Sequence, residues 1–574
     1  MQTLNEQTIT LPPALMREVA KAQETWHSKE NTRRLWEADA TLWTGRDEGA
    51  WLGWLDIVGK ELREAGALQE FGRQLRAENF TDVLLLGMGG SSLGPEVLAT
   101  SLGSAPGYPK WHMLDSTDPQ QVGRFERGID AARTLYIVSS KSGTTLEPNV
   151  LMDYFLAKAP ASAGNAATCQ FVAITDPGSQ LQKTAEAKGF RRVFHGVPNI
   201  GGRYSVLSHF GMVPLAAIGH DPRAFLEAAG AMAQACGPNL PPAQNPGVAL
   251  GLAIGVLAAA GCNKLTIFAS PSIGAFGLWA EQLLAESTGK NGKGVIPVAG
   301  EPLSEPSAYG EDRLFVYLRD PARADPAQDR LIDALARGGH PVVRITVGSP
   351  ILLAQEFFRF EIATAVAGAV LGINPFDQPD VEASKVAARK ITQAFEKTGA
   401  LPVEPPVFEA SGITLYTDTR NAESLRKLGA NATLGSWLKA LFATLEGGDY
   451  FALLAYVDAT EARLQALQGL RAALRDRKRV ATCLQFGPRF LHSTGQAYKG
   501  GPNSGVFLQI TARPAPDLAI PERKASFGVI EAAQARGDFR ILAERGRRVL
   551  HAHIDHDVDA GLAAIGKAAR LALA

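Results

Sequence analysis

The chain has 574 residues, which is enough for three or four domains of about 150 residues each. Hydrophobic residues make up 46% and charged residues 20%, the balance of an ordinary globular protein. Lysine plus arginine and aspartate plus glutamate both number 58, so the zero net charge argues against a nucleic-acid partner and any affinity for phosphate must be local.

The first 235 residues predict a helical segment followed by a sheet domain. Residues 1–60 look helical, and we expect their tryptophans to serve in packing, as a lid or interface over the sheet domains: Trp26, Trp36, Trp43, Trp51 and Trp54. From Asp82 onward, helical stretches separate apolar runs that have the pattern of strands, namely DVLLLG, WHMLDS, LYIVSS, FVAITD and RRVFHGV. Strands separated by helices of this length predict a doubly wound parallel sheet, which we assign to residues 61–235.

A second unit of the same texture spans residues 236–400. It begins with an apolar helix at 247–261, and its predicted strands are KLTIFAS, RLFVYLRD and PVVRITV. The proline-rich segment 401–406 (LPVEPP) then separates a further region, residues 401–574, with strands YFALLAYV, RVATCLQF, GVFLQIT and VLHAHID. The predicted fold class is therefore α/β: an N-terminal helical segment, two doubly wound parallel-sheet domains and an additional C-terminal α/β domain.

No segment has the pattern of a leader peptide or a membrane span. The first residues lack a basic start followed by an apolar core, and the apolar run 247–261 is too short and too rich in Gly and Ala to cross a bilayer. The cysteines lie far apart without a C-x-x-C pair, so neither a disulfide framework nor a zinc site is predicted: Cys169, Cys236, Cys262 and Cys483. We expect a cytoplasmic protein without a membrane partner.

The segment 139–147 (SSKSGTTLE) has the pattern of a phosphate cradle. Thr144 and Glu147 have capping-box spacing, so the following helix is predicted to begin near Thr144. Such a helix N-terminus attracts a phosphate dianion. The side chains that converge on it are Ser140, Lys141, Ser142 and Thr145. A turn rich in Ser and Thr that merely caps its helix is the alternative interpretation.

Three further motifs fall at strand ends, where ligands gather in open α/β sheets, or on helices that enter there. In GMGGSSLGP (87–95) the glycines allow close approach of a ligand and Ser91 can donate to it, although any tight turn could look like this. In GGRYS, Arg203 is either a surface charge or a fixed cation for a developing oxyanion. Gln282 and Glu286 share a helix face, and apolar neighbours would partly desolvate Glu286, which suits a general base; an exposed helix glutamate is the alternative.

Together these motifs resemble the phosphoglucose isomerase family. The patterns GMGGSSLGP, SSKSGTTLE, GGRYS, QLLAESTGK and NPFDQPDVEASK occur in the family's order, and the resemblance covers about residues 60–395. The stretch WEADATLWTGRDEGAWLGWLD and the extra C-terminal domain are more similar to the isomerase half of bifunctional transaldolase–isomerase proteins, although we find no transaldolase portion. The resemblance implies two sugar-isomerase (SIS) sheet domains, a sugar phosphate as small-molecule substrate and a homodimer.

The resemblance also implies roles for the matching residues. Glu286 would take the C2 proton and return it to C1, and Arg203 would stabilise the cis-enediolate between these steps. The residues that hold the phosphate would be Gly90, Ser91, Ser140, Ser142 and Thr145, with Lys141 adding charge. Gln282 and Gln378 would bond sugar hydroxyls, and Lys385, on a helix that Pro379 can start, would assist ring opening. No metal and no cofactor is implied.

One departure from the family concerns the histidine that opens the sugar ring. It normally follows the E-S-x-G-K segment and comes from the neighbouring subunit, but here that region reads GEPLSEPSAYGEDRLF. The stretch HSTGQAYKGG, which begins at His492, resembles the family's histidine helix, so we expect His492 to be the ring-opening acid/base. The alternatives are that HSTGQAYKGGPNSG is an ordinary surface loop, or that His209 has this role.

A second histidine cluster lies near the C-terminus, in VLHAHIDHD. His551, His553 and His556 stand beside Asp555 and Asp557 with the density of a metal site. The alternation indicates a strand edge that runs into a turn, so we favour a structural role over a metal site.

The predicted activity is the interconversion of glucose 6-phosphate and fructose 6-phosphate. A non-catalytic sugar-phosphate sensor of the same fold is one alternative, but such a sensor has no use for Glu286 or Arg203. An isomerase that also accepts mannose 6-phosphate is the other, and it would keep every residue named above.

Overall fold

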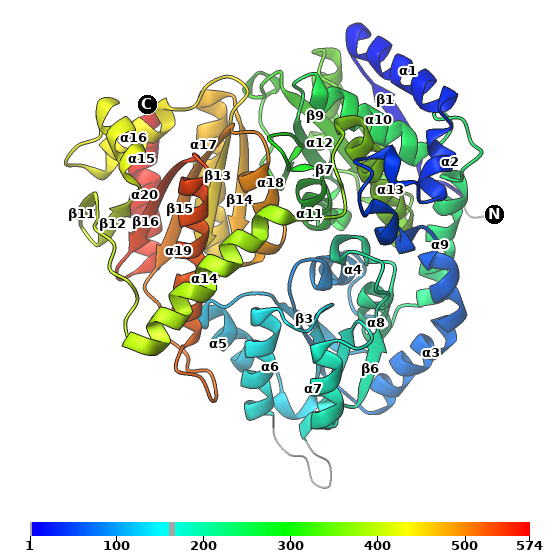
Figure 1. The fold of residues 1–574 in the computed structure, drawn as a ribbon, viewed down its shortest axis with the longest axis horizontal. Coiled ribbons are helices and arrows are strands. Elements are labelled where there is room, and N and C mark those ends of the chain that lie inside the picture. Colours follow the sequence, from blue (N-terminus) through cyan, green and yellow to red (C-terminus); the bar gives the residue numbers. More distant parts are fainter. Residues whose placement is uncertain (1–2, 160–166) are drawn as a thin grey trace. The chain divides into compact units, whose positions relative to one another are not determined.

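A computed structural model describes residues 3–159 and 167–574 (Figure 1). The chain divides into two compact units, each formed by separate stretches of sequence. Unit 1 contains Met1–Asp115, Phe125–Thr288 and Leu314–Asp377, and unit 2 contains Ser116–Arg124, Gly289–Arg313 and Gln378–Ala574. Helix α5 (Pro119–Gly128) contributes residues to both. None of the described helices combines the length and apolarity that a bilayer span needs.

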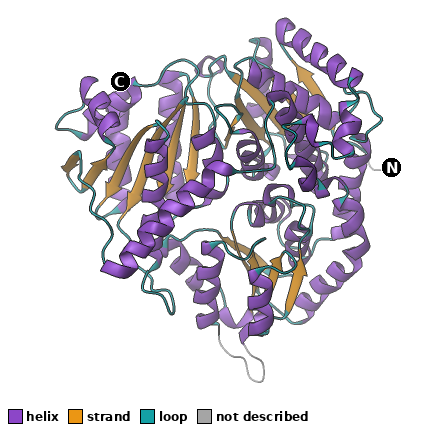
Figure 2. Ribbon diagram, in the orientation of Figure 1, coloured by secondary structure: helices purple, strands orange, loops and turns teal. Residues whose placement is uncertain are grey.

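The first sheet of unit 1 is parallel throughout (Figure 2). Its strands follow the order β3-β2-β4-β5-β6. They are β2 (Asp82–Gly87), β3 (Lys110–Leu114), β4 (Thr134–Ser139), β5 (Phe171–Thr175) and β6 (Arg192–His195). The central strands β2, β4 and β5 are buried along their whole length, as expected for a parallel sheet that helices cover on both faces. This confirms the predicted doubly wound arrangement.

The second sheet of unit 1 contains the order β1-β10-β9-β7. Its strands are β1 (Glu6–Thr10), β7 (Lys264–Ala269), β9 (Arg313–Arg319) and β10 (Val342–Thr346). Strands β9 and β10 are parallel, whereas β1 pairs with β10 in antiparallel fashion. The first 60 residues therefore contribute a strand that the helical prediction missed. Its sequence EQTIT is short and alternates between exposed and half-buried residues.

Helices connect and cover the strands of unit 1. The long ones are α1 (Pro13–Ser28), α3 (Ile57–Ala77), α6 (Leu146–Lys158), α9 (Pro222–Ala235), α10 (Pro246–Ala259), α11 (Phe276–Thr288), α12 (Pro326–Arg337) and α13 (Leu353–Leu371). The shorter ones are α2 (Asn31–Trp36), α4 (Leu93–Leu102), α7 (Gln180–Lys188) and α8 (His209–Ala217). The predicted apolar helix at 247–261 is confirmed as α10, which is largely buried and packs along α13.

Tryptophans of the N-terminal segment pack inside unit 1. Trp54 is fully buried and stacks on Tyr204, with ring centroids 5.2 Å apart. The indole nitrogen of Trp43 donates to the carbonyl of Ala365 at 2.8 Å, and its ring meets Phe376 edge-on. These contacts agree with a packing role, and they place the N-terminal segment against the turn that carries Arg203.

The sheet of unit 2 has the order β11-β12-β16-β15-β13-β14. Strands β13 to β16 are parallel to one another, and β11 and β12 add an antiparallel edge. The strands are β11 (Phe408–Ala410), β12 (Ile413–Tyr416), β13 (Tyr450–Tyr456), β14 (Ala481–Phe486), β15 (Gly505–Ala512) and β16 (Arg548–Ile554); β8 (Ile296–Ala299) also belongs to this unit. The predicted α/β character of the C-terminal region is confirmed.

Helices cover both faces of this sheet. One face packs on α16 (Leu434–Ala443), α17 (Glu461–Lys478) and α20 (Val558–Leu573) in a single apolar core. On the other face α19 (Phe527–Glu544) contacts β15 and β16 and packs along α14 (Pro379–Thr398), as Figure 1 shows. Two further helices complete the unit, α15 (Thr419–Lys427) and α18 (Gly495–Gly500).

A buried ion pair ties the segment 289–313 to the C-terminal sheet within unit 2. Glu301 and Arg313 are fully buried and lie 2.9 Å apart, and Glu301 also accepts from the backbone and hydroxyl of Thr482 on β14. Burial alone would raise the pKa of Glu301, but the guanidinium groups of Arg313 and Arg471 outweigh burial and lower this pKa. A buried charge is tolerated only when it is paired and hydrogen-bonded, which explains why this segment sides with the later strands.

Candidate active site

The Gly-rich turn and the cradle segment follow two neighbouring parallel strands of unit 1. Gly87 at the end of β2 is in register with Ser139 at the end of β4, so both segments leave the same edge of the sheet. The Gly-rich turn forms a 3-10 helix, η4 (Gly89–Ser91), before α4. A Cβ on Gly90 would lie 2.0 Å from the carbonyl oxygen of Gly202, so only glycine fits where these turns meet.

The cradle segment forms a tight turn before α6. The hydroxyl of Ser140 accepts from the backbone N–H of Gly143 at 3.2 Å, and Gly143 has a φ of +71°, which favours glycine. The predicted capping box of Thr144 and Glu147 is wrong. Helix α6 begins at Leu146, and its N-cap Thr145 makes no side-chain cap hydrogen bond. A helix start without a side-chain cap leaves backbone donors for an anion.

Lys141 lies within the cradle segment, but its charge is compensated. Its ammonium group forms an ion pair with Asp176, which follows β5, and donates to the carbonyls of Val197 and Pro198 at 3.3 and 3.2 Å. Lys141 thus links three loops at this edge of the sheet. The positive field at the cradle therefore comes chiefly from the start of α6.

Arg203 is the most heavily bonded side chain of the candidate site. It belongs to η7 (Gly202–Tyr204) and is 2% exposed. Its Nε donates to the hydroxyl of Ser287 at 2.7 Å, and one Nη donates to the carbonyls of Pro375 and Asp377 at 2.7 and 3.0 Å. A guanidinium bonded on several sides cannot swing away, so Arg203 is a fixed cation and not a surface charge.

Glu286 lies beside this cation. The residue is 8% exposed, and its carboxylate lies 3.6 Å from Nη1 of Arg203 and accepts from the side-chain amide of Gln282 at 3.0 Å. Gln282 and Glu286 lie one turn apart on α11, as the sequence predicts, and the alternative of an exposed helix glutamate is wrong. The structure thus joins a buried carboxylate, a fixed cation and an amide in one cluster.

The elements that carry these residues contact one another. The turn η7 touches both η4 and α11, and α11 also touches η4. Ser91 at the end of η4, Arg203 on η7 and Glu286 on α11 are therefore held by mutually contacting elements of unit 1. The cradle segment follows the strand next to β2 in the same sheet.

Sequence reasoning missed Ser287 and Tyr204, which are buried beside Arg203, and the buried Glu361. Ser287 accepts from Arg203 and lies 3.3 Å from the hydroxyl of Tyr204. Burial raises the pKa of Tyr204, and the carboxyl of Glu361 on α13 is among the charges that act on it. Burial also raises the pKa of Glu361 well above its usual value, and neither of its carboxyl oxygens has a hydrogen-bond partner in the described chain. A lone acid in the apolar run FRFEIATAV is the signal that could have drawn attention to Glu361.

The remaining predicted residues lie in unit 2. Gln378 is the N-cap of α14, and Pro379 is its first residue, as predicted. Lys385 lies two turns further along the helix, is partly exposed and has a weak ion pair with Glu382 at 4.0 Å. The resemblance to the family, and not a distance, links Gln378 and Lys385 to the residues of unit 1.

His492 ends a 3-10 turn, η12 (Arg489–His492), that contacts α14. The residues after it form α18 and are almost entirely buried, so the alternative of an ordinary surface loop is wrong. Gln496 donates to the carbonyl of Gly289 at 2.9 Å and accepts from the backbone of Asp380 at 2.9 Å. A Cβ on Gly500 would lie 2.2 Å from a carboxyl oxygen of Asp380. The motif is thus packed on the start of the helix that carries Lys385.

His209, the rival for ring opening, lies in a different environment. Its Nδ1 donates to the carbonyl of His195 at 2.7 Å, and its Nε2 faces Glu64 and Glu61 at 3.2 and 3.6 Å. Burial lowers the pKa of His209, while burial and the charge of Glu64 raise the pKa of Glu61 to about 8. His209 is engaged on both ring nitrogens, which favours a structural role.

The C-terminal histidines do not form a metal cluster in the described chain. Strand β16, which carries His551 and His553, runs into a bend at His556, as the alternation predicts, but it lies between β12 and β15 and is not at the edge of the sheet. The hydroxyl of Thr511 lies 2.7 Å from a ring nitrogen of each histidine. Both rings therefore have partners within the sheet.

Comparisons with known proteins point to one family. The family model described as phosphoglucose isomerase matches residues 69–301. A glucose-6-phosphate isomerase of Trichormus variabilis is 30% identical over 369 residues, which are 57% of this chain and 69% of the relative. One of Prochlorococcus marinus is 30% identical over 351 residues, 55% of this chain and 63% of the relative. The chain thus spans about two thirds of the length of these curated relatives.

A solved structure has a similar fold. It is a glucose-6-phosphate isomerase of Chlamydia trachomatis, 24% identical, with a TM-score of 0.51 over 64% of this chain and 78% of that one. At this identity the likeness concerns the fold alone. It agrees with the parallel sheets and covering helices described above.

The raised pKa of Glu61, beside His209, can be tested through the pH dependence of stability. An unfolded glutamate loses its proton near pH 4.5, whereas Glu61 in the folded chain loses it near pH 8. The folded state therefore binds more protons in this window, so its stability falls as the pH rises. We expect the free energy of unfolding of the wild type to drop between pH 5 and pH 9 by about 2–4 kcal/mol more than that of Glu61→Gln, as measured by urea denaturation.

The control for this test is Glu70→Gln, because Glu70 is half exposed on the same helix. This variant should follow the wild-type pH profile. Parallel profiles for the wild type and Glu61→Gln would contradict the raised pKa of Glu61.

Proposed function

Because the chain belongs to the phosphoglucose isomerase family, we propose that it interconverts glucose 6-phosphate and fructose 6-phosphate as an aldose–ketose isomerase. One observation carries the proposal: the buried carboxylate of Glu286 lies 3.6 Å from a guanidinium that is bonded in place. A base next to a fixed cation is what the transfer of a proton between adjacent sugar carbons requires.

Glu286 is the proposed base. It takes the proton from C2 of the open-chain aldose, and the electron pair of the C–H bond enters the cis-enediolate. It then returns the proton to C1, while the hydroxyl proton on the oxygen of C2 passes to the oxygen of C1, so that the carbonyl moves to C2 and the ketose forms. The amide of Gln282, 3.0 Å from the carboxylate, fixes the orientation of the carboxylate, and Gln282 is also proposed to bond sugar hydroxyls.

Arg203 is the proposed stabiliser of the enediolate. Charge develops on the oxygens of C1 and C2 during proton transfer, and a cation already held by Ser287 and two carbonyls needs no reorganisation to meet it. The guanidinium also lies in a buried, weakly screened setting, where its field is stronger than in water.

The phosphate of the substrate is proposed to bind at the turns after β2 and β4. Gly90 and Ser91 come from one turn, and Ser140, Ser142 and Thr145 from the other, with Lys141 tying the second turn to its neighbours. The start of α6, without a side-chain cap, supports this role because its N–H groups and helix dipole favour a dianion. Binding the phosphate would hold C1 and C2 of the sugar within reach of the base, Glu286.

Ring opening is assigned to unit 2. His492 is the proposed acid/base and Lys385 its assistant, while Gln378 is proposed to contact sugar hydroxyls. The support is the sequence motif together with its burial and its packing against the start of α14. A homodimer and a cytoplasmic location are further parts of this proposal, and both rest on the resemblance to the family.

Glu286→Gln tests the base. The amide keeps the shape and a hydrogen bond but cannot accept the C2 proton, so we expect kcat for fructose 6-phosphate to fall by about 10²–10⁴-fold, with a much smaller change in KM. Glu281→Gln, an acid-to-amide change on the same buried helix, is the matched control and should retain most of the activity. Wild-type turnover in Glu286→Gln would remove Glu286 from its role.

His492→Ala tests the ring-opening step separately. The exchange between the α and β anomers of glucose 6-phosphate can be followed by NMR line shapes in the presence of enzyme. We expect His492→Ala to slow this exchange by about 10²-fold or more, whereas Glu286→Gln should leave it intact. His556→Ala, at an exposed histidine of the same unit, is the control. Unchanged anomer exchange in His492→Ala would transfer the role to another residue.

A further inference from the structure

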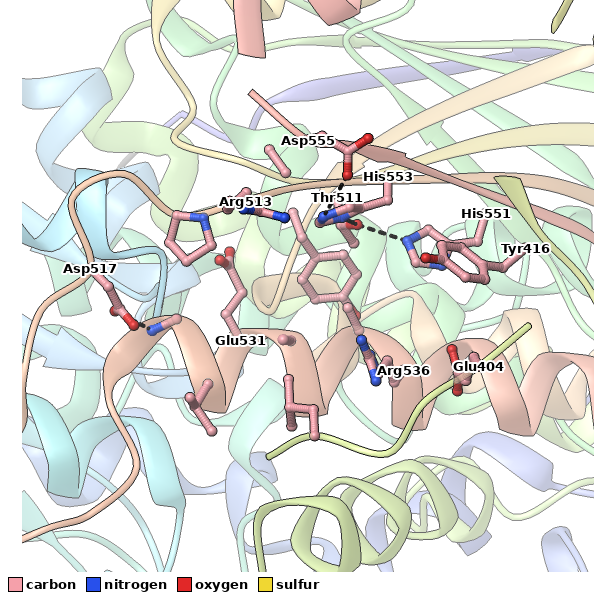
Figure 3. Close-up of a pocket in the computed structure, with 18 residues that line it drawn as sticks. Glu404, Tyr416, Thr511, Arg513, Asp517, Glu531, Arg536, His551, His553 and Asp555 are labelled. Carbon is pink, nitrogen blue, oxygen red and sulfur yellow. Dashed lines mark hydrogen bonds and ion pairs between the residues drawn. The ribbon is translucent and has the colours of Figure 1, made fainter. Parts of the chain in front are cut away.

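A cavity lies within unit 2, and the residues proposed above for the isomerase reaction are not among those that line it. It has a volume of about 360 Å³, which is in the range of sites for small molecules. Figure 3 shows it between α19 and the ends of β15 and β16, with the segment after Leu401 on one side. The proposed isomerase reaction does not use this cavity.

The cavity occupies the position where open parallel sheets bind ligands. From β13 the chain passes through α17 to β14, whereas from β15 it passes through α19 to β16 on the other side of β13. The two helices cover opposite faces of the sheet. Tyr456, the last residue of β13, and Thr511, near the end of β15, both line the cavity. This is a topological switch point at the carboxyl ends of the strands, where a crevice opens.

Glu531 of α19 is the unusual group in this cavity. It is 6% exposed, and its Oε1 has no hydrogen-bond partner among the described residues. Burial, reinforced by the carboxyl groups of Asp118, Asp517 and Asp458, raises its pKa well above the usual value. In Figure 3 its side chain rises from α19 toward the loop that carries Arg513. Glu531 is thus a buried acid among other acids and has no cation to pair with.

The charged groups around Glu531 do not supply that cation. Arg124 is committed to Asp458 through two hydrogen bonds of 2.7 and 3.1 Å, and Arg463 is committed to Asp559. Burial raises the pKa of Asp118 to about 6. Asp517 caps the start of α19, where it accepts from the backbone of Gly528 at 2.8 Å.

The histidines of the cavity do not supply a cation for Glu531 either. Burial lowers the pKa of His551 to about 3 and also lowers the pKa of His553, so both are neutral near pH 7. Their ring nitrogens are engaged with Thr511. The ring centroids of His551 and Tyr416 lie 5.4 Å apart, and both residues line the cavity. Aromatic rings form a surface that suits a cation.

Two arginines also line the cavity. Arg536 donates to the carbonyl of Pro402 at 2.5 Å, which fixes its position. The exposed Arg513 has no ion pair with a carboxylate of the described chain and can meet an anion that enters. The cavity thus combines a buried acid without a cation and an arginine without an anion.

We propose that this cavity binds a small zwitterion, whose ammonium group pairs with Glu531 and whose carboxylate meets Arg513. The ammonium group gives the buried carboxyl the partner it lacks and ionises it, and the proton of Glu531 leaves to solvent. The aromatic rings contact the carbon chain between the two charges. The neutral histidines and Thr511 remain bonded to one another.

Simple probes of matched length test this proposal on the full chain. They are 4-aminobutyrate, which carries both charges, butylamine, which carries the ammonium group only, and butyrate, which carries the carboxylate only. Isothermal titration at pH 7 in two buffers of different ionisation enthalpy measures affinity and proton release together. We expect 4-aminobutyrate to bind most tightly and butyrate least, with about one proton released for each amine bound.

Variants assign the effect to the residues. Glu531→Gln should weaken the binding of 4-aminobutyrate about tenfold or more and abolish proton release, because an amide cannot ionise. Glu404→Gln, an exposed acid that lines the same cavity, is the matched control and should bind as the wild type does. Arg513→Gln should lower the affinity for 4-aminobutyrate to the affinity for butylamine. Circular dichroism and the melting temperature show that each variant is folded.

Several results would overturn the proposal. They are equal affinity for butyrate and butylamine, binding without proton release, unchanged binding in a folded Glu531→Gln, or no binding of either amine at millimolar concentration. An unchanged preference for 4-aminobutyrate in Arg513→Gln would remove the carboxylate contact. None of these outcomes depends on the proposed isomerase reaction.

Discussion

The interaction on which unit 1 depends is the set of bonds made by the Arg203 guanidinium. A buried cation is stable only where polar groups surround it, and here these come from α11 and from the segment after α13. The same bonds place the cation 3.6 Å from Glu286. One requirement of folding, that a buried charge be satisfied, therefore produces the pair of charges that the proposed chemistry uses.

The surroundings of Arg203 explain several features that look unrelated in the sequence. Gly90 must lack a side chain because its turn meets Gly202 at van der Waals distance. Trp54 stacks on Tyr204, so the N-terminal segment supports the same turn from another side. The stacked rings and the close backbone contact restrict the turn in which Arg203 lies. A site built this way gains precision from packing, which is what positioning a reactive carbon demands.

Local sequence patterns predicted the long elements well and the short ones poorly. The apolar helix α10 and the buried strands β4 and β13 have strong, regular patterns. Strand β1 was missed because five alternating residues next to helical segments carry little signal. The capping box at Thr144 failed because the helix starts two residues later. Local patterns also could not assign residues 289–313 to unit 2, since bonds between distant residues decide this: Glu301 accepts from Thr482, and Arg471 donates to the carbonyl of Ala299.

The candidate site shows the same division. Glu286, Gln282 and Arg203 were found because motifs mark them, and the structure brings these three together. Ser287, Tyr204 and Glu361 were not found, because burial and contacts in the folded chain, and not a spacing in the sequence, distinguish them. The cavity around Glu531 was also invisible, although its histidines were noticed, since its acid and its arginines come from segments that only folding brings together.

The most direct test of the central claim follows hydrogen itself. When the wild-type chain equilibrates fructose 6-phosphate in D₂O, deuterium should enter C1 of fructose 6-phosphate and C2 of glucose 6-phosphate, where NMR detects it. Glu286→Gln should bind the sugar phosphate and yet show almost no deuterium incorporation over the same time. Incorporation at the wild-type rate in that variant would contradict the account, because another group would then be moving the proton.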